Sequence, residues 1–510
     1  MRKQRVLVTV LSAAAILSAG QAFTSMAAAR GWVQQENEWV YLDSSGEPVT
    51  NEWKKKDGKW VYLDDDGFVS SSQWVEDSQY VDEKGNMVVN QWIYAEEDES
   101  PSGEEGWFYL NAKGKAVAEG WKNIGDDRYY FDSDGRMMTG WFYDDNDTYY
   151  LGDDGAMRTG WLALEFMEDR IPEEGEVSDS HEAASDDIKW FYFQGNGKAF
   201  KGTADEPLQR NIGGKKYYFD EHGVMMTGWV AVASPAEADK TGITRYKYLG
   251  EADDGVMEKG WKYLEEHPSS LADTKMVKGT KALPEDGEGY WYYFDKDGTP
   301  KFMDQNADSM TSLAHKIDGD YYFFDEYGCL QTGLIGFEKA DGTMIAGYFG
   351  DEDSNGKMYT GRHTNVEEED GSKYTYFFNN SGASRGAGVN GEKNGYLYSN
   401  GRLVTADDDS DYQVFKVDGK LYLVNESGKV QTSNKLYKSE GEYAYEYADG
   451  VIYRVNEEKE RVEEITEGRA LPEIAFDAVY KIGKSWVRGD NNDIRQEEAC
   501  YENYVGLSHY

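Results

Sequence analysis

Cysteine is nearly absent from this chain of 510 residues, since only Cys329 and Cys500 occur and they lie far apart. A disulfide framework of the kind that stabilises small secreted domains is therefore excluded. Two unlinked thiols are favoured, and a single disulfide between these two residues stays an alternative. Histidine is also scarce: the six residues stand singly, without an H-E-x-x-H motif or a Cys/His spacing for zinc, at positions 181, 222, 267, 315, 363 and 509. We predict no metal site and no cofactor.

Positive charge is the next shortage, because 53 Lys and Arg face 96 Asp and Glu for a net charge of −43. Such a surface repels nucleic acid, whose phosphates need Lys and Arg contacts. It repels anionic lipid as well and favours cationic partners.

Long apolar runs are missing too, except at the start of the chain. Arg2, Lys3 and Arg5 precede an apolar run from Val6 to about Leu17, and small residues lead to Ala27-Ala28-Ala29. This layout predicts a secretory signal peptide over residues 1–29, too short to span a bilayer at about 20 apolar residues. Its removal would take the net charge to about −46 and leave an exported chain without membrane insertion.

Aromatic residues replace the scarce aliphatic ones, at 15% of the chain with 39 tyrosines. They recur in a fixed order: Gly120-Trp121, Tyr129-Tyr130-Phe131, an acidic turn ending in Gly135, and Met137-Met138-Thr139 before Gly140-Trp141. The period is twenty residues, with about sixteen copies between Gly31 and Val455. Each copy reads as a β-hairpin that is marginal alone, so copies must stack.

We therefore predict an all-β fold, an elongated solenoid of stacked β-hairpins with a short irregular or partly helical C-terminal tail. Residues 30–333 form a Trp-rich array with acidic insertions at 163–187 and 265–287, read as exposed loops. Residues 334–455 form a Trp-poor array, with a similar insertion at 364–371. Residues 456–510 are a tail or cap, in which the glutamates from Glu457 to Glu464 suggest a short polar helix.

The copy Gly31-Trp32…Trp39-Val40-Tyr41-Leu42-Asp43…Gly46, repeated from Trp53 to Gly67, resembles the choline-binding, or cell-wall-binding, repeat family. Glucan-binding repeats of extracellular glucosyltransferases and receptor-binding repeats of bacterial cytotoxins share the hairpin. The resemblance implies ligand sites between successive hairpins. Each is an open aromatic box made by the Trp that opens a copy, the aromatic that begins its second strand, and the last Tyr of the next copy's strand. Ring faces of this kind suit a quaternary ammonium.

Carried over residue by residue, the resemblance implies five boxes: Trp32, Trp39 and Tyr62; Trp53, Trp60 and Tyr80; Trp92, Trp107 and Tyr130; Trp161, Trp190 and Tyr218; and Trp229, Tyr246 and Tyr293. Trp261 and Trp291 pair only with Phe323, which keeps a ring but loses a hydroxyl. Elsewhere Arg128, Thr148 and Lys216 replace the aromatic that begins the strand. Because a cation such as Arg128 or Lys216 there repels choline, we expect those copies to be structural spacers or to be adapted to another ligand. These aromatic residues also have to form the core of a hairpin solenoid, so packing alone stays an alternative role for each of them.

The sequence carries no sign of catalytic chemistry, because no nucleophile arrangement stands out and the paired carboxylates lack an apolar context. The Asp-x-Asp-Gly turns lack the further ligands of a calcium loop. We therefore expect a non-enzymatic wall-binding protein that uses several weak sites together on choline-bearing teichoic acid or a similar polymer. A glucan ligand, an adhesin that meets a host or partner protein, and a partner subunit of a wall hydrolase stay open as alternatives.

Overall fold

The computed structural model describes residues 30–35, 37–76, 78–144, 146–165, 177–178, 188–233, 242–251, 253–268, 287, 289–304, 307–350 and 355–483. The predicted signal peptide, Cys500 and most of the acidic segments 163–187 and 265–287 lie outside these residues. Contacts divide the chain into two compact units, residues 1–199 and 200–510. The boundary expected at 333/334 from the loss of tryptophan stays a prediction.

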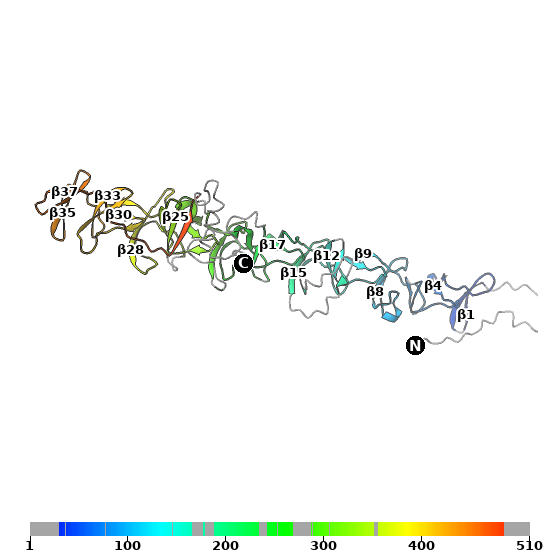
Figure 1. Cartoon of the computed structure of the whole chain (residues 1–510). Helices are drawn as coiled ribbons and strands as arrows, with labels where there is room; N and C mark the ends of the chain where they lie inside the picture. Colours follow the sequence, from blue (N-terminus) through cyan, green and yellow to red (C-terminus); the bar gives the residue numbers. More distant parts are fainter. Residues whose placement is uncertain are drawn as a thin grey trace, which may run out of the picture. The chain divides into compact units, whose positions relative to one another are not determined.

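The first unit is a series of antiparallel hairpins, each following the last along the chain (Figure 1) and two-stranded except where Val177–Ser178 adds a third strand to one of them. Its strands are β1 Gly31–Gln35, β2 Glu38–Leu42, β3 Glu52–Lys56, β4 Lys59–Leu63, β5 Gln73–Val75, β6 Gln79–Val81, β7 Gln91–Ala95, β8 Gly106–Leu110, β9 Gly120–Ile124, β10 Asp127–Phe131, β11 Gly140–Asp144, β12 Asp147–Leu151, β13 Gly160–Glu165, β14 Val177–Ser178 and β15 Ile188–Phe193, with a 3₁₀ turn η1 at Glu97–Glu99.

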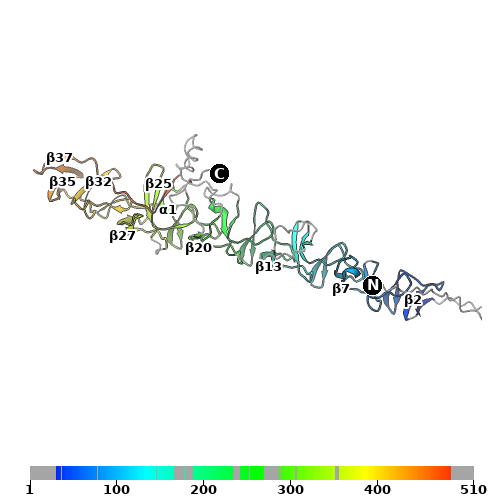
Figure 2. The ribbon, with the colours of Figure 1, turned by 60° about the horizontal axis from the view of Figure 1, so that its bottom comes forward.

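The second unit begins with the same hairpins and then builds wider sheets, of which the strands β27, β35 and β37 are labelled in Figure 2. Its elements are β16 Leu208–Ile212, β17 Lys215–Phe219, β18 Trp229–Ala231, η4 Ile243–Arg245, β19 Tyr246–Tyr248, β20 Gly260–Leu264, β21 Tyr290–Phe294, α1 Met310–Leu313, β22 His315–Ile317, β23 Asp320–Phe324, β24 Leu330–Gln331, β25 Leu334–Lys339, β26 Met344–Tyr348, β27 Gly361–Glu367, β28 Lys373–Phe378, β29 Gly391–Lys393, β30 Tyr396–Ser399, β31 Arg402–Leu403, β32 Tyr412–Val417, β33 Lys420–Asn425, β34 Lys435–Ser439, β35 Glu442–Ala448, β36 Val451–Val455, β37 Arg461–Glu464 and β38 Ala478–Ile482.

In many copies, the turn after the second strand is closed by an acidic residue of that copy. The Oδ1 of Asp132 accepts hydrogen bonds from the backbone amides of Asp134 and Arg136, at 3.0 and 2.8 Å. Gly135 then takes a φ of +87°, which a residue with a side chain rarely adopts. This carboxylate therefore serves the turn, as the sequence predicted.

Backbone hydrogen bonds join each copy to the one before it. After the turn, the amide of Met137 donates to the carbonyl of Trp107 in the preceding hairpin, at 2.7 Å, while the amide of Met138 donates to Tyr130 of its own, at 2.9 Å. The same link runs from Val69 to Trp39 at 3.0 Å and from Met157 to Arg128 at 2.8 Å. Hairpins within a unit are thereby stacked on one another, in agreement with the all-β prediction.

The last residue of most second strands lies in the core of the stack. Leu63, Leu110, Phe131 and Phe193 are all fully buried. Since one two-stranded hairpin cannot enclose such a side chain, its neighbours along the chain must cover it.

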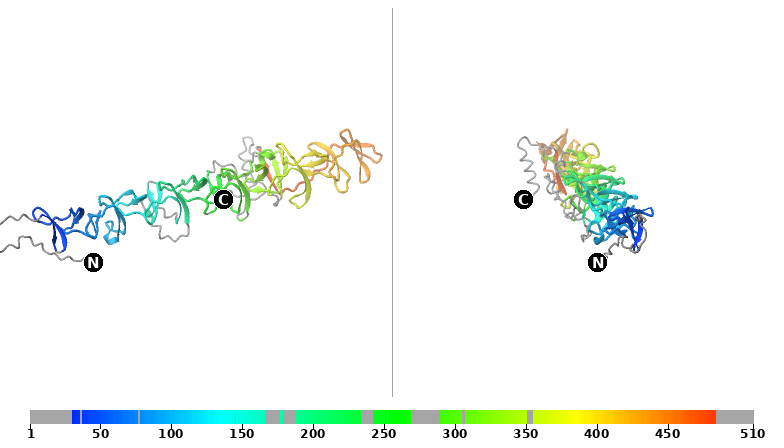
Figure 3. Two further views of the ribbon diagram at one scale, coloured as in Figure 1. Left: turned by 180° about the vertical axis from the view of Figure 1, so that it is seen from behind. Right: turned by 90° about the vertical axis from the view of Figure 1, so that its right-hand side faces the viewer.

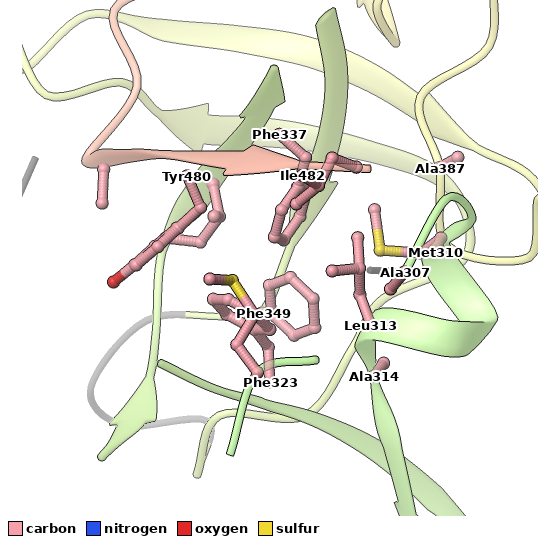
Figure 4. Packing of buried hydrophobic residues seen from close by; sticks show 13 residues of the cluster. Ala307, Met310, Leu313, Ala314, Phe323, Phe337, Phe349, Ala387, Tyr480 and Ile482 are labelled. Atoms are coloured by element: carbon pink, nitrogen blue, oxygen red, sulfur yellow. The ribbon is translucent and has the colours of Figure 1, made fainter. Parts of the chain in front are cut away.

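The largest apolar cluster of the second unit includes residues from the end of the described chain. Tyr480 and Ile482 of β38 pack with Phe323, Phe337 and Phe349, as Figure 4 shows. Strand β38 pairs in parallel with β25, and both Figure 1 and Figure 3 place its orange-red ribbon beside the yellow-green residues of β25.

The predicted polar helix of the tail is wrong. Arg461–Glu464 is strand β37, whose Arg461 guanidinium bonds both carboxylate oxygens of Glu446, at 2.7 and 3.0 Å. Beyond it the chain runs back past earlier hairpins, since the amide of Arg469 donates to Val414 and that of Asp477 to Leu334. Alternating Ala478, Tyr480 and Ile482 then fill the core, because a period of two places them on one face of a strand.

The acidic segment 364–371 also differs from the prediction of an exposed loop. Strand β27 extends into it as far as Glu367, with a bulge between His363 and Val366, so the first half of the segment is strand. Glu368 is 2% exposed, and its carboxylate accepts hydrogen bonds from the Tyr376 hydroxyl at 2.7 Å and from the Ala475 amide at 3.0 Å. A carboxylate with these donors can be buried, which composition alone does not indicate.

Candidate aromatic binding sites

Each hairpin places its aromatic residues on two faces. We call the tryptophan of the first strand the opening tryptophan, and we number the four residues before the turn as positions one to four, so that Arg128 is position one and Phe131 is position four. Side chains alternate along a strand, so positions one and three share a face with the opening tryptophan. Trp121 accordingly pairs across the hairpin with Tyr130, with ring centroids 5.3 Å apart.

Position two provides the contact with the preceding copy. Trp92 lies 5.0 Å from Tyr129 of the next hairpin, and Trp261 lies 4.8 Å from Tyr322. The same contact joins Trp74 to Phe108, Trp121 to Tyr149, Trp141 to Phe191 and Trp229 to Tyr292. The opening tryptophan is thus packed between two copies.

The residue predicted as the third ring of each box is therefore one position away from the residue that contacts the preceding tryptophan. Tyr62, Tyr80, Tyr130 and Tyr293 occupy position three, and each lies against the opening tryptophan of its own copy, at 5.2–5.5 Å. A shift of one residue along a strand exchanges its two faces. The residue facing the preceding tryptophan is Tyr129 in place of Tyr130, and Tyr322 in place of Phe323, which is fully buried in the core.

The most complete aromatic site lies on the hairpin β20–β21 of the second unit. Trp261 and Trp291 form an open corner, with centroids 6.4 Å apart and planes at 81°. Tyr293 and Tyr322 flank Trp261 at 5.2 and 4.8 Å, and Tyr263 flanks Trp291 at 5.5 Å. Trp291 and Tyr263 are 48% and 53% exposed, so a ligand can reach them.

The hairpin β7–β8 of the first unit carries a similar set of rings. Trp92 contacts Tyr109 and Tyr129 at 5.1 and 5.0 Å, and Tyr94 contacts Trp107 at 5.3 Å. Tyr94 and Trp107 are each 44% exposed. Tyr94 and Tyr263 were not predicted from the sequence, although both stand in the pattern Trp-x-Tyr of the first strand, which recurs at Trp141-Phe142-Tyr143.

Lysines lie over the exposed rings of the first two predicted boxes. The Lys56 Nζ is 4.0 Å from the ring centroid of Trp39, and the Lys55 Nζ is 5.2 Å from that of Trp60. The opening tryptophans Trp32 and Trp53 donate their indole N–H groups to the Lys55 carbonyl and to Glu76, at 2.8 and 3.2 Å. The chain's own cations thus contact these aromatic faces.

The remaining two boxes contain residues of mixed exposure. Trp161 and Trp190 repeat the open corner, at 6.4 Å and 80°, in the first unit, whereas Tyr218 belongs to the second unit and is buried. Trp229 is half-buried against Tyr248 and Tyr292. Tyr246 is 4% exposed in an apolar cluster, so it contributes to the core and not to an open box.

Arg128 occupies the face of its own opening tryptophan, as the sequence suggested. Its guanidinium carbon lies 4.4 Å from the ring centroid of Trp121, beside an open cavity of about 420 Å³ lined also by Lys122 and Asn123. The Trp121 indole donates to Asp144 at 3.1 Å. In contrast, Thr148 is buried.

Two tyrosines near these sites, Tyr94 and Tyr322, have a raised pKa. A hydrogen bond to Glu105, together with burial and nearby acidic charge, raises the pKa of Tyr94. Burial raises the pKa of Tyr322. Each phenol is therefore a neutral ring and a hydrogen-bond donor at neutral pH.

Two searches of the described residues bear on other classes of function. No group of three or more His, Cys, Asp or Glu side chains there is arranged to hold a metal ion. Nor does that part of the chain contain a helix of the length and apolarity needed to cross a membrane.

These features define a class, the repeat proteins built of stacked, aromatic-rich β-hairpins. The choline-binding repeat family matches residues 118–161 and 209–237, and the putative cell wall binding repeat matches residues 51–67 and 285–299. The chain therefore carries repeats of the choline-binding, or cell-wall-binding, family, as the resemblance indicated.

Individual relatives are more distant. Glucosyltransferase-S of Streptococcus mutans is 25% identical over 259 residues, which span 46% of this chain and 16% of that enzyme. Among solved structures, CbpJ of Streptococcus pneumoniae is 19% identical over 70% of this chain and 99% of its own, with a TM-score of 0.35. The modular autolysin LytC of the same species is 21% identical over 60% of this chain and 55% of its own, with a TM-score of 0.34.

Proposed function

We propose that this chain is an exported, non-catalytic protein that attaches to a bacterial cell-wall polymer through its aromatic sites, with choline on teichoic acid or a similar polymer as the ligand. The observation that carries the proposal is the exposed corner of Trp261 and Trp291 with tyrosine rings beside it. Ring faces attract a quaternary ammonium by about 0.5–2 kcal/mol each. Several such sites on one chain bind a polymer much more tightly than one site does.

Charge supports a cationic ligand group. The net charge of −43 attracts cations towards the whole chain. At the β7–β8 site, Glu105 accepts the hydrogen bond of the Tyr94 hydroxyl at 3.1 Å, which places a carboxylate beside the exposed rings. A trimethylammonium group meets both the rings and the acidic surroundings favourably.

Titration of the full chain with choline chloride tests this function. We expect millimolar choline to quench tryptophan fluorescence and to elute the protein from choline-bearing wall polymer. Trp291→Ala should weaken the retention, whereas Val462→Ala, which removes an apolar side chain 62% exposed on β37, should leave it unchanged. Choline that neither quenches nor elutes would contradict the proposal.

A glucan is the second candidate ligand. It is favoured by the match to glucosyltransferase-S and by rings such as Trp107 that are exposed widely enough to stack on a sugar. Retention on dextran without any response to choline would support this candidate. A response to neither would favour an adhesin or a partner subunit of a wall hydrolase.

A further inference from the structure

The hairpins differ at one residue next to the exposed tryptophan. The residue two places after the opening tryptophan lies directly across the hairpin from position one, and we call it the gate residue. The pairs are Lys55 with Trp60, Tyr94 with Trp107, and Tyr263 with Trp291. The three indoles have similar exposures of 44%, 44% and 48%, so their surroundings distinguish the sites.

A lysine gate supplies a competing cation. The Lys55 Nζ lies 5.2 Å from the centroid of the Trp60 ring, within the range of a cation–π contact. A cationic ligand that binds to this ring must displace the Lys55 ammonium or bind against its electrostatic repulsion at close range. Lys56 acts on Trp39 of the preceding hairpin in the same way, at 4.0 Å.

A tyrosine gate supplies a further ring. Tyr94 meets Trp107 at 63° and Tyr263 meets Trp291 at 59°, so each pair forms a second aromatic corner beside the opening tryptophan. In the described part of the chain, no lysine or arginine lies over Trp107 or Trp291. These two sites therefore offer more ring surface to a cation and, among the residues that the structure describes, no competing lysine or arginine.

The backbone holds the Tyr263 ring in place. Gly289 lies so close to its phenol end that a Cβ at this position would overlap the ring. The φ of Gly289 is not in the left-handed region, so alanine is compatible with the backbone and would act by displacing Tyr263.

We propose that the gate residue decides which hairpins accept a quaternary ammonium: Lys55 closes the site of Trp60, and Tyr94 and Tyr263 each complete an open site, one in each compact unit. This assignment rests on the proposed function, and it adds which copies bind and why. The tyrosines contact the ligand, whereas Gly289 is a positioning residue.

The test uses the full chain labelled with 5-fluorotryptophan and titrated with tetramethylammonium chloride, with sodium chloride as the ionic control. The ¹⁹F signals of Trp60, Trp107 and Trp291 are assigned by replacing each tryptophan with phenylalanine. Wild-type protein should show saturable shifts at Trp107 and Trp291 and weaker binding at Trp60. Because one cation–π contact is worth about two- to fivefold in affinity, Tyr263→Lys should weaken binding at Trp291 by about that factor or more.

Matched variants separate the two effects of the gate. Tyr263→Phe should keep the affinity at Trp291, Tyr263→Gln should lose only the ring, and Gly289→Ala should weaken binding with every aromatic residue retained. Lys55→Tyr should strengthen binding at Trp60. Equal wild-type affinities at Trp60 and Trp291, or an unchanged affinity after Tyr263→Lys, would overturn the gate proposal while the proposed function stands. A chain in which no tryptophan responds to tetramethylammonium would instead contradict the choline function itself.

Discussion

The contact between successive copies can be tested at a single glycine. Gly155 closes the turn after β12 with a φ of +74°, and a Cβ there would overlap the sulfur of Met137 from the preceding copy. Gly125, at the tip of the hairpin β9–β10, has a similar φ of +66° but nothing within 4 Å of such a Cβ. The two glycines therefore share the backbone requirement and differ only in the contact between copies.

The expected costs follow from this difference. An alanine in the left-handed region costs about 1–2 kcal/mol, which applies to Gly125→Ala and Gly155→Ala alike. Displacing a packed methionine adds about 1–3 kcal/mol to Gly155→Ala alone. Amide hydrogen exchange in β12 should then be roughly five- to 150-fold faster in Gly155→Ala than in Gly125→Ala.

Hydrogen exchange resolved by peptide is the suitable assay, because a chain of two units does not unfold in one step. In a Met137→Ala background, Gly155→Ala should cost less than in the wild type, since the overlapping side chain is gone. If the two alanine variants lose equal protection, the methionine contact does not join the copies and the reasoning fails.

Three further predictions concern charge and burial. Arg128→Ala removes the guanidinium that lies over the Trp121 ring and should therefore create an additional tetramethylammonium site, seen as a new saturable ¹⁹F shift of Trp121. An unchanged Trp121 signal would refute the idea that Arg128 occupies this site in the wild type. Glu368→Ala should leave the Tyr376 hydroxyl without its acceptor, a loss of about 1–3 kcal/mol, and should increase exchange around residues 473–477; protection equal to wild type would exclude that role. Burial raises the pKa of Tyr292 and Tyr376 above the usual 10. Because the unfolded chain loses these protons first, stability should be complete below about pH 10 and fall above it; ultraviolet absorbance that shows both ionising in the folded chain at pH 10 would contradict this.

The hairpins could be predicted from the sequence because their determinants are local. The acidic turn residue and the glycine act within a few positions, as the amides of Asp134 and Arg136 bonded to Asp132 illustrate. Repetition of the opening tryptophan then made stacking necessary, since one hairpin cannot bury its rings.

The site was predicted less completely. The opening tryptophans and exposed residues such as Trp107 and Trp60 were named from the sequence, and so was the cation Arg128, which lies over the Trp121 ring. The third ring differed by one residue, because the face that meets the preceding copy depends on how two hairpins stack and not on either alone. Lys55 and Lys56 were not noticed, since a cation over a ring is visible only when the register of the hairpin is known.

The sequence by itself determined the compartment expected for the chain, the repeat, the hairpin and the aromatic character of its faces, because these follow from composition and from contacts a few residues apart. Only the tertiary structure decided which ring faces which copy, which indoles the chain's own cations cover, and where the tail lies. Strand β38 pairs with β25 across more than a hundred residues, and Glu368 is buried against Ala475. Such contacts join segments that are far apart in the chain, and neither segment's sequence indicates its partner. Tertiary packing therefore decides which segments meet.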